Sequence, residues 1–166
     1  MEKIKRAVLD TGPLTHLDEI GEEKNLEIIE DIFIPAEVEE EFKRHRGKKL
    51  DIETKELSSK AKSYASLLMQ KHKIDLGEAE AIALAKQERI NLFFTDDWYA
   101  REVANHLNIE THGTLALVLR AYRENMTNEK EALKTLEKLL RNSSLFITDK
   151  IINEAKEKVR KFESES

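Results

Sequence analysis

The sequence contains no cysteine, which excludes disulfide bridges, thiolate metal sites and a cysteine nucleophile. No apolar run approaches the roughly 18 residues of a membrane helix. The first ten residues, MEKIKRAVLD, hold no apolar stretch as long as that of a signal peptide. From these absences we expect a protein of the cytoplasm.

Positive charge is also limited: 28 Lys and Arg face 33 Asp and Glu, which gives a formal net charge of −5. This balance argues against a surface that is basic throughout and binds nucleic acid over its whole extent, but it allows a local basic cluster. One such cluster follows Phe42 and includes Lys43, Arg44 and Arg46. We expect these side chains either to contact substrate phosphates or to form a solvated loop.

Short apolar segments alternate with helical patterns along the chain. The expected strands are 4–9, 32–34, 91–95, 109–111 and a short one at 145–147. Two helices are expected to begin near Leu14 and near Pro35, and a third, which includes Ala100, follows the strand 91–95. Further helices are expected over 22–30, 54–72, 75–89, 114–124, 129–141 and 149–162. This alternation predicts a helix-rich α/β fold with a parallel sheet covered on both faces. A length of 166 residues predicts one domain, 1–166, with its core at about 4–124 and C-terminal helices at about 128–162.

Acidic residues stand where the predicted strands end and helices begin. Asp10 closes the first strand, and the pair Asp96 and Asp97 follows the strand 91–95. Glu41 lies on the helix after Pro35, and Glu78 opens the alanine-rich helix. Such positions converge at the carboxyl edge of a parallel sheet. Clustered carboxylates repel one another, and a hard divalent cation such as Mg²⁺ or Mn²⁺ relieves that repulsion. The sequence therefore predicts a metal-dependent enzyme that acts on phosphate esters.

Each acidic site has alternatives. They are Glu37 or Glu40 in place of Glu41, Glu80 in place of Glu78, and either member of the Asp pair. An acid at a helix start can also serve only as a cap or as a complement to the helix dipole. Thr11 and Thr95 stand beside Asp10 and Asp96, so their hydroxyls could orient a carboxylate or a water molecule.

Other polar and aromatic residues carry weaker signals. The five histidines show no spacing typical of metal ligands, so we expect structural or exposed roles for them. Trp98 and Tyr99 are expected to pack in the interior, with base stacking as the alternative. Asp10-Thr11-Gly12 matches the active-site tripeptide of retroviral-type aspartic proteases, but five Gly and a mostly helical pattern exclude that all-β fold. A haloacid dehalogenase site would need a second Asp at position 12, which is Gly.

Five ordered segments resemble the PIN-domain family, in its prokaryotic branch close to VapC-like toxins. They are VLDTGPLTHLDEIG, IPAEVEEEF, DLGEAEAIALAKQ, LFFTDDWYAREVA and HGTLALVLRA. The resemblance covers residues 4–124 and implies a three-layer α/β/α sandwich with a central parallel sheet. It departs from many members at Glu78, where they have Asp, and at Gly12, where they have Ser.

The resemblance also implies an activity: hydrolysis of phosphodiester bonds of single-stranded RNA with Mg²⁺ or Mn²⁺. By position, Asp10, Glu41, Glu78 and Asp97, or Asp96, would be the catalytic and metal-binding acids, with Thr11 and Thr95 supporting them. If the chain is the toxin of a toxin–antitoxin pair, an antitoxin protein would cover the site, and a homodimer could form through the helix 114–122. The alternative is a catalytically degenerate PIN-like module that binds RNA or protein.

Overall fold

Four short parallel strands form the sheet of this protein. The structure, a computed structural model, describes the backbone of residues 1–165 and the side chains of residues 1–162. The strands are β1 (Ile4–Leu9), β2 (Ile29–Phe33), β3 (Leu92–Phe94) and β4 (Glu110–His112). They pair in the order β2-β1-β3-β4, with β1 and β3 in the centre. Their carboxyl ends therefore meet along one edge, as the sequence predicts.

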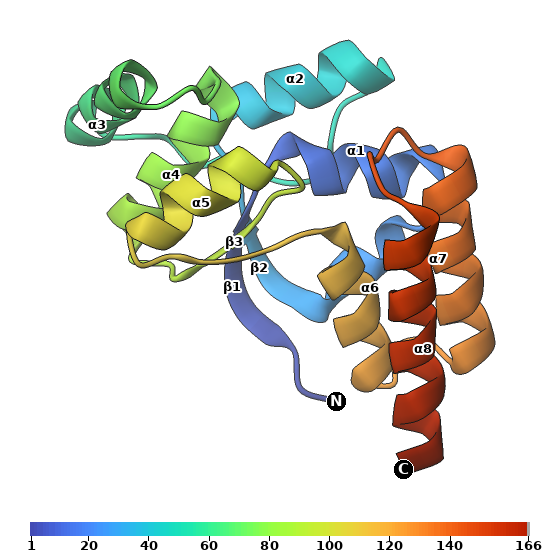
Figure 1. The fold of residues 1–166 in the computed structure, drawn as a ribbon. Coiled ribbons are helices and arrows are strands. Elements are labelled where there is room, and N and C mark those ends of the chain that lie inside the picture. Colours follow the sequence, from blue (N-terminus) through green and yellow to red (C-terminus); the bar gives the residue numbers. More distant parts are fainter. Residues whose placement is uncertain (166) are drawn as a thin grey trace.

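Helices connect the strands and cover the sheet (Figure 1). The helices are α1 (Thr11–Glu19), the 3₁₀ helix η1 (Glu23–Ile28), α2 (Ala36–Arg46), α3 (Ser59–Lys71), α4 (Leu76–Glu88), α5 (Trp98–His106), α6 (Thr114–Arg123), α7 (Glu129–Asn142) and α8 (Asp149–Glu165). Among residues 1–165 there is no helix with both the length and the apolar character needed to span a membrane.

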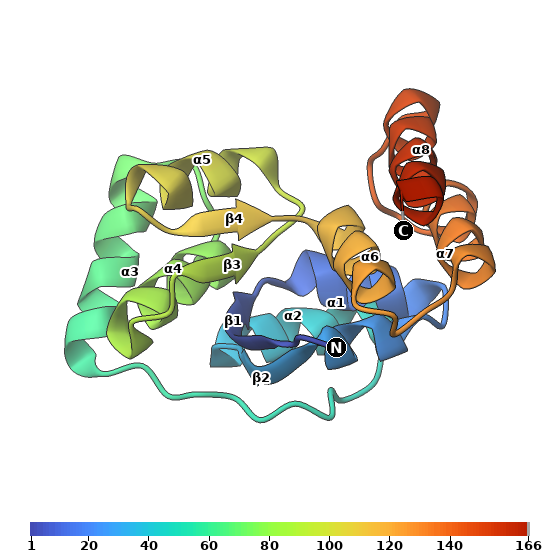
Figure 2. The same ribbon diagram turned by 90° about the horizontal axis from the view of Figure 1, so that it is seen from below.

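The two faces of the sheet carry two apolar cores, because successive strand residues point to opposite sides. Leu9 and Phe94 belong to the core shared with α1, α6, α7 and α8. Val8 and Phe93 belong to the core shared with α3, α4 and α5. Figure 2 shows these two groups of helices on either side of the strands. The predicted three-layer α/β/α architecture with a parallel sheet is confirmed.

Helix α4 is buried almost all round, which explains its run of alanines. Ala79, Ala81, Ala83 and Ala85 are each at most 1% exposed. Small side chains let this helix approach both the sheet and α3, so its first turn is carried to the carboxyl edge of the strands. Glu78, in that first turn, is buried with it.

The segment before α3 differs from the prediction. A helix was expected over 54–72, but α3 begins at Ser59, where the Ser58 hydroxyl caps it by accepting from the backbone N of Ala61 at 3.1 Å. The preceding residues run beside the end of β2 instead. Thr54 bridges Ile34, and the backbone N of Lys55 donates to the carbonyl of Ile34 at 2.9 Å. Backbone pairing at the edge of the sheet outweighs helix formation there.

Two further expected elements are wrong. The strand expected at 145–147 is absent, and these residues form the α7–α8 loop, where Leu145 and Ile147 pack against the core while Phe146 is exposed. The helix expected over 22–30 is the short η1, and Ile29 already begins β2. A short apolar run such as 145–147 identifies residues that can contact the core, but it does not supply the neighbouring strand that a sheet requires.

Candidate functional site

A cavity of about 350 Å³ lies at the carboxyl edge of the sheet. Its walls come from the β1–α1 and β3–α5 junctions, from α1, α2 and the start of α4, and from the α7–α8 loop. The acids that line it are Asp10, Glu41, Asp75, Glu78, Asp96 and Asp97. The structure thus brings the five predicted acids to one cavity and adds Asp75 to them.

Asp10 is the most buried of these acids and is held on both oxygens. Its Oδ1 accepts from the backbone N of Thr11 at 2.8 Å, and its Oδ2 accepts from the hydroxyl of Thr95 at 2.9 Å. The pKa of Asp10 is raised to about 7 despite these hydrogen bonds. Burial is the largest cause, and the charges of the nearby Asp75 and Glu41 contribute to the rise. The ionised form of this carboxyl group is therefore disfavoured in the metal-free protein.

Glu41 reaches the cavity from α2 and contacts α1 and α4. Its Oε2 accepts from the hydroxyl of Thr11 at 3.0 Å. Its Oε1 lies over Gly77, where an added Cβ would be only 2.1 Å away, so glycine at this position makes room for the carboxylate. Burial, followed by the charge of Asp75, raises the pKa of Glu41. Thr11 thus supports Asp10 through its backbone and Glu41 through its hydroxyl.

Glu78 and Asp75 lie together at the start of α4. Asp75 caps the helix by accepting from the backbone N of Glu78 at 2.8 Å. Burial raises the pKa of Glu78 to about 9, and a hydrogen bond between its carboxyl group and that of Asp75 also raises it. The neighbouring alternative, Glu80, points elsewhere: its Oε1 accepts from the backbone N of Glu37 at 3.3 Å, at the start of α2.

The two aspartates after β3 have different partners. Asp96 accepts from the backbone N of Thr114 at 2.7 Å and from its hydroxyl at 2.6 Å, and its Oδ2 lies 2.6 Å from Nδ1 of His16. Burial alone would raise the pKa of Asp96, but the hydrogen bonds from His16 and Thr114 together lower it. Asp97 is exposed and uses Oδ1 to cap α5, accepting from the backbone N of Ala100 at 2.8 Å. Asp97 therefore has more free oxygen for a ligand than Asp96.

The chemistry of the cavity fits a hard cation. In the described part of the chain, no three Asp, Glu or His side chains already stand together as a metal site. The donor set is nevertheless all oxygen, and Asp10, Glu41 and Glu78 share raised pKa values because each is buried among other acids. Mg²⁺ and Mn²⁺ prefer such carboxylate donors, and an ion among them would remove the repulsion.

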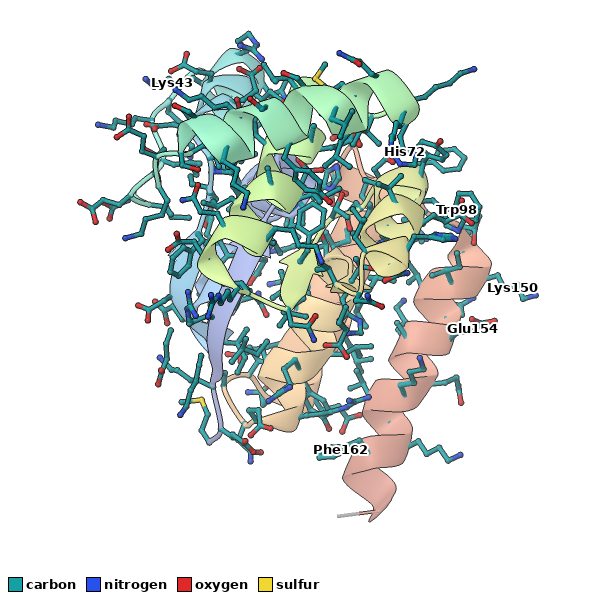
Figure 3. All side chains as sticks on the ribbon, turned by 90° about the vertical axis from the view of Figure 1, so that its left-hand side faces the viewer. Lys43, His72, Trp98, Lys150, Glu154 and Phe162 are labelled. Carbon is teal, nitrogen blue, oxygen red and sulfur yellow. The ribbon has the colours of Figure 1, made fainter. Side chains whose placement is uncertain are left out.

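The basic cluster on α2 is largely paired within the protein. Arg44 lies 2.8 Å from Glu37, and Arg46 lies 2.6 Å from the buried Asp18. Lys43 is 3.7 Å from the exposed Glu40, and Figure 3 shows it projecting outward. Contact between these three cations and RNA stays a prediction. Lys43 is freer to make such a contact than Arg44 and Arg46, because its acidic partner is more distant and exposed.

The aromatic residues after Asp97 are not packed as expected. Trp98 is 67% exposed and Tyr99 is 38% exposed, so the prediction of interior packing is wrong for Trp98. Figure 3 shows Trp98 at the periphery of the molecule. Helix α5 buries the opposite stripe of Ala100, Val103 and Ala104, which leaves its first residue facing outward.

Comparison with known proteins gives one match. A family model described as a PIN domain matches residues 6–161 of the chain. Nothing among curated proteins or solved structures matches significantly. The match includes α7 and most of α8, well beyond residues 4–124 on which the sequence resemblance was based.

Proposed function

The chain belongs to the PIN-domain family, whose members are generally nucleases, and from this premise we propose that it is a Mg²⁺- or Mn²⁺-dependent endoribonuclease. Its substrate would be single-stranded RNA, cleaved by hydrolysis of a phosphodiester bond. One observation carries the proposal: Asp10, Glu41 and Glu78 converge on one cavity where burial raises all three of their pKa values.

The residues have distinct roles in this proposal. Asp10, Glu41, Glu78 and Asp97 would hold the cation, which when bound polarises a phosphate and lowers the pKa of water. Thr95 and Thr11 donate to Asp10 and Glu41 and so fix the directions of these carboxylates before any ligand binds. Asp75 adds negative charge beside Glu78 and Asp10. It strengthens the preference of the cavity for a cation.

Cleavage of a labelled single-stranded RNA with and without Mn²⁺ tests the proposal. The wild-type protein is expected to cut only with metal, and Asp10→Asn is expected to abolish cutting while the protein stays folded. Glu80→Gln is the matched control, since Glu80 lies two residues from Glu78 but contacts the start of α2. Full activity of Asp10→Asn would show the assignment to be wrong.

A non-catalytic PIN-like module that binds RNA or protein is the second candidate. It is favoured by the fact that among residues 1–162 no three Asp, Glu or His side chains are preassembled as a metal site. Mn²⁺ titration by calorimetry separates the candidates. A nuclease is expected to bind Mn²⁺ and to lose binding in Asp10→Asn, whereas a degenerate module is expected to bind none in either form.

We also propose that the protein belongs to the VapC-like branch and acts as the toxin of a toxin–antitoxin pair. The exposed rim of the acidic cavity supports this, because an antitoxin could cover it with a basic or apolar segment. A homodimer is a further proposal. Co-purification with the product of a neighbouring gene, followed by loss of RNA cleavage in the complex, would support the toxin role.

A further inference from the structure

The cavity has a second end that the proposed hydrolysis does not use. Away from the carboxylates of α2 and α4, its lining comes from α1 and from the α7–α8 loop: Thr15, His16, Ser144, Leu145 and Phe146. These five residues, which we call the loop end, include no acid. If the phosphate of a substrate strand lies at the acidic end, the nucleotide on one side of it would lie toward this surface. The nucleotide on the other side would point away from it.

Thr15 brings an unsatisfied polar atom to the loop end. The residue is 7% exposed, and its Oγ1 is buried without a hydrogen-bond partner among the described residues. A threonine inside a helix usually donates to the carbonyl one turn before it. A buried hydroxyl without a partner is destabilising. Because Oγ1 is fully buried, Thr15 shapes the loop end by packing and its hydroxyl does not face a ligand.

His16 brings an oriented imidazole. Its Nδ1 lies 2.6 Å from Oδ2 of Asp96, which is itself fixed by two hydrogen bonds from Thr114. Because an ionised Asp96 can only accept, Nδ1 carries the hydrogen of this bond, and Nε2 is the ring nitrogen not used by Asp96. Nε2 has no partner in the described part of the chain, and His16 lines the cavity.

Phe146 brings an exposed aromatic ring on an anchored loop. Its side chain is 97% exposed, although it also borders the cavity. Two residues earlier, the backbone N and the hydroxyl of Ser144 both donate to Oε1 of Glu19 at 2.9 Å, which ties the loop to the end of α1. Leu145 packs against the core. The loop therefore holds an exposed aromatic residue at the cavity rim.

We propose that the loop end binds the nucleotide next to the hydrolysed phosphodiester and selects RNA over DNA. The base stacks on Phe146, and the ribose 2′-hydroxyl forms a hydrogen bond with Nε2 of His16. Stacking on aromatic rings and recognition of the 2′-hydroxyl are the usual means of binding single-stranded RNA. This inference rests on the proposed nuclease function and names the residues that would choose its substrate.

Binding can be measured apart from cleavage in an Asp10→Asn background. The probe is a fluorescein-labelled single-stranded oligoribonucleotide, compared with DNA of the same sequence, in Mg²⁺ by fluorescence anisotropy. Phe146→Ala is expected to weaken binding of both by about 5-fold to 100-fold, the range of one stacked base. His16→Gln is expected to reduce the preference for RNA over DNA about 5-fold.

Thr15→Val tests the packing beneath the loop end. It is expected to raise Tm, because it removes an unsatisfied buried hydroxyl. Ile151→Ala is the matched apolar control for Phe146. Ile151 is 45% exposed in the first turn of α8 and does not line the cavity, so RNA affinity is expected to be unchanged.

Cleavage by the wild-type protein is measured in parallel. If the wild type cleaves RNA but Phe146→Ala and His16→Gln bind RNA and DNA as the background protein does, the inference is wrong and the proposed function stands. If the wild type neither cleaves nor binds single-stranded RNA, the proposed function fails and the inference fails with it.

Discussion

At the scale of the residue, the acidic site shows a conflict between stability and ligand binding. Asp10 is 7% exposed, and burial raises its pKa from 3.8 to about 7. A shift of this size corresponds to roughly 4 kcal/mol of unfavourable free energy when the carboxylate is ionised. If the proposed function is right, a cation bound to the same carboxylate would offset this cost.

Asp10→Asn should therefore stabilise the protein in chelator at roughly pH 8, by about 1 to 4 kcal/mol. Asn removes the buried charge and can still accept from the hydroxyl of Thr95. Urea denaturation monitored by circular dichroism measures the change. The same pair at roughly pH 3 serves as control, since Asp10 is then protonated in the folded state and largely protonated in the unfolded state. A destabilised mutant at the higher pH would contradict this explanation.

Gly77 makes a second residue-scale prediction. Gly77→Ala places a Cβ within 2.1 Å of Glu41 Oε1 and should displace that carboxylate. Alanine favours the helix by about 1 kcal/mol, so the free energy of unfolding should not fall while RNA cleavage drops at least about 10-fold. Gly12→Ala is the control, because its added Cβ meets Asp96 only at 3.4 Å. Equal activities of the two variants would show that Glu41 has no role in cleavage.

At the scale of the element, the segment after α2 is held to α1 by one buried acid. Asp18 lies 2.6 Å from Arg46 at the end of α2 and 2.5 Å from Lys48 just beyond it. Burial alone would raise the pKa of Asp18, but hydrogen bonds from Lys48 and Arg46 lower it overall. Asp18 thus fixes the point where the chain leaves α2 and turns toward the edge of the sheet.

Asp18→Asn should loosen this connection. The substitution removes the buried negative charge that pairs with Arg46 and Lys48. It is expected to lower the free energy of unfolding by about 1 to 3 kcal/mol and to speed proteolysis within residues 47–58. Glu40→Gln is the matched control, because its pair with Lys43 is exposed and should contribute less than about 1 kcal/mol. Unchanged proteolysis in Asp18→Asn would show that the segment is held by other contacts.

At the scale of the whole molecule, the ionisable groups set the pH at which the metal-free protein is most stable. Asp10 and Glu78 have folded pKa values of about 7 and about 9, above their ordinary values. Stability from their protonated forms is complete in acid and is lost as pH rises through these values. Asp18 and Asp96 have lowered pKa values, so their contribution is present above about pH 4 and is lost below it.

The metal-free protein is therefore expected to be most stable in mildly acidic solution and to lose stability toward roughly pH 9. Thermal unfolding in chelator across this range measures the effect. Mg²⁺ or Mn²⁺ at 100 times its dissociation constant should restore about 2.7 kcal/mol at neutral pH. A stability that rises steadily from acid to alkaline pH would contradict the raised pKa values.

The sequence predicted the layers and the acids but not the contacts between particular side chains. Strand ends and helix starts are local features, so Asp10, Glu78 and the Asp pair could be located from spacing alone. The pairing of His16 with Asp96 joins α1 to the β3–α5 junction, and nothing near either residue in the sequence signals it. For the same reason nothing in the sequence indicates that Asp75 reaches the cavity, and the apolar run at 145–147 predicts a strand where the structure has a loop.

The chain segment beside β2 has a consequence for how copies of the protein behave together. An uncovered strand at the edge of a sheet offers free backbone groups to another molecule and can begin aggregation. Here Thr54 and Lys55 pair with Ile34, just beyond the end of β2, and Lys55 places its ammonium group 5.3 Å from the ring centroid of Phe33. The protein thus covers the carboxyl end of this edge with its own backbone and a positive charge, which opposes intermolecular strand pairing at high concentration.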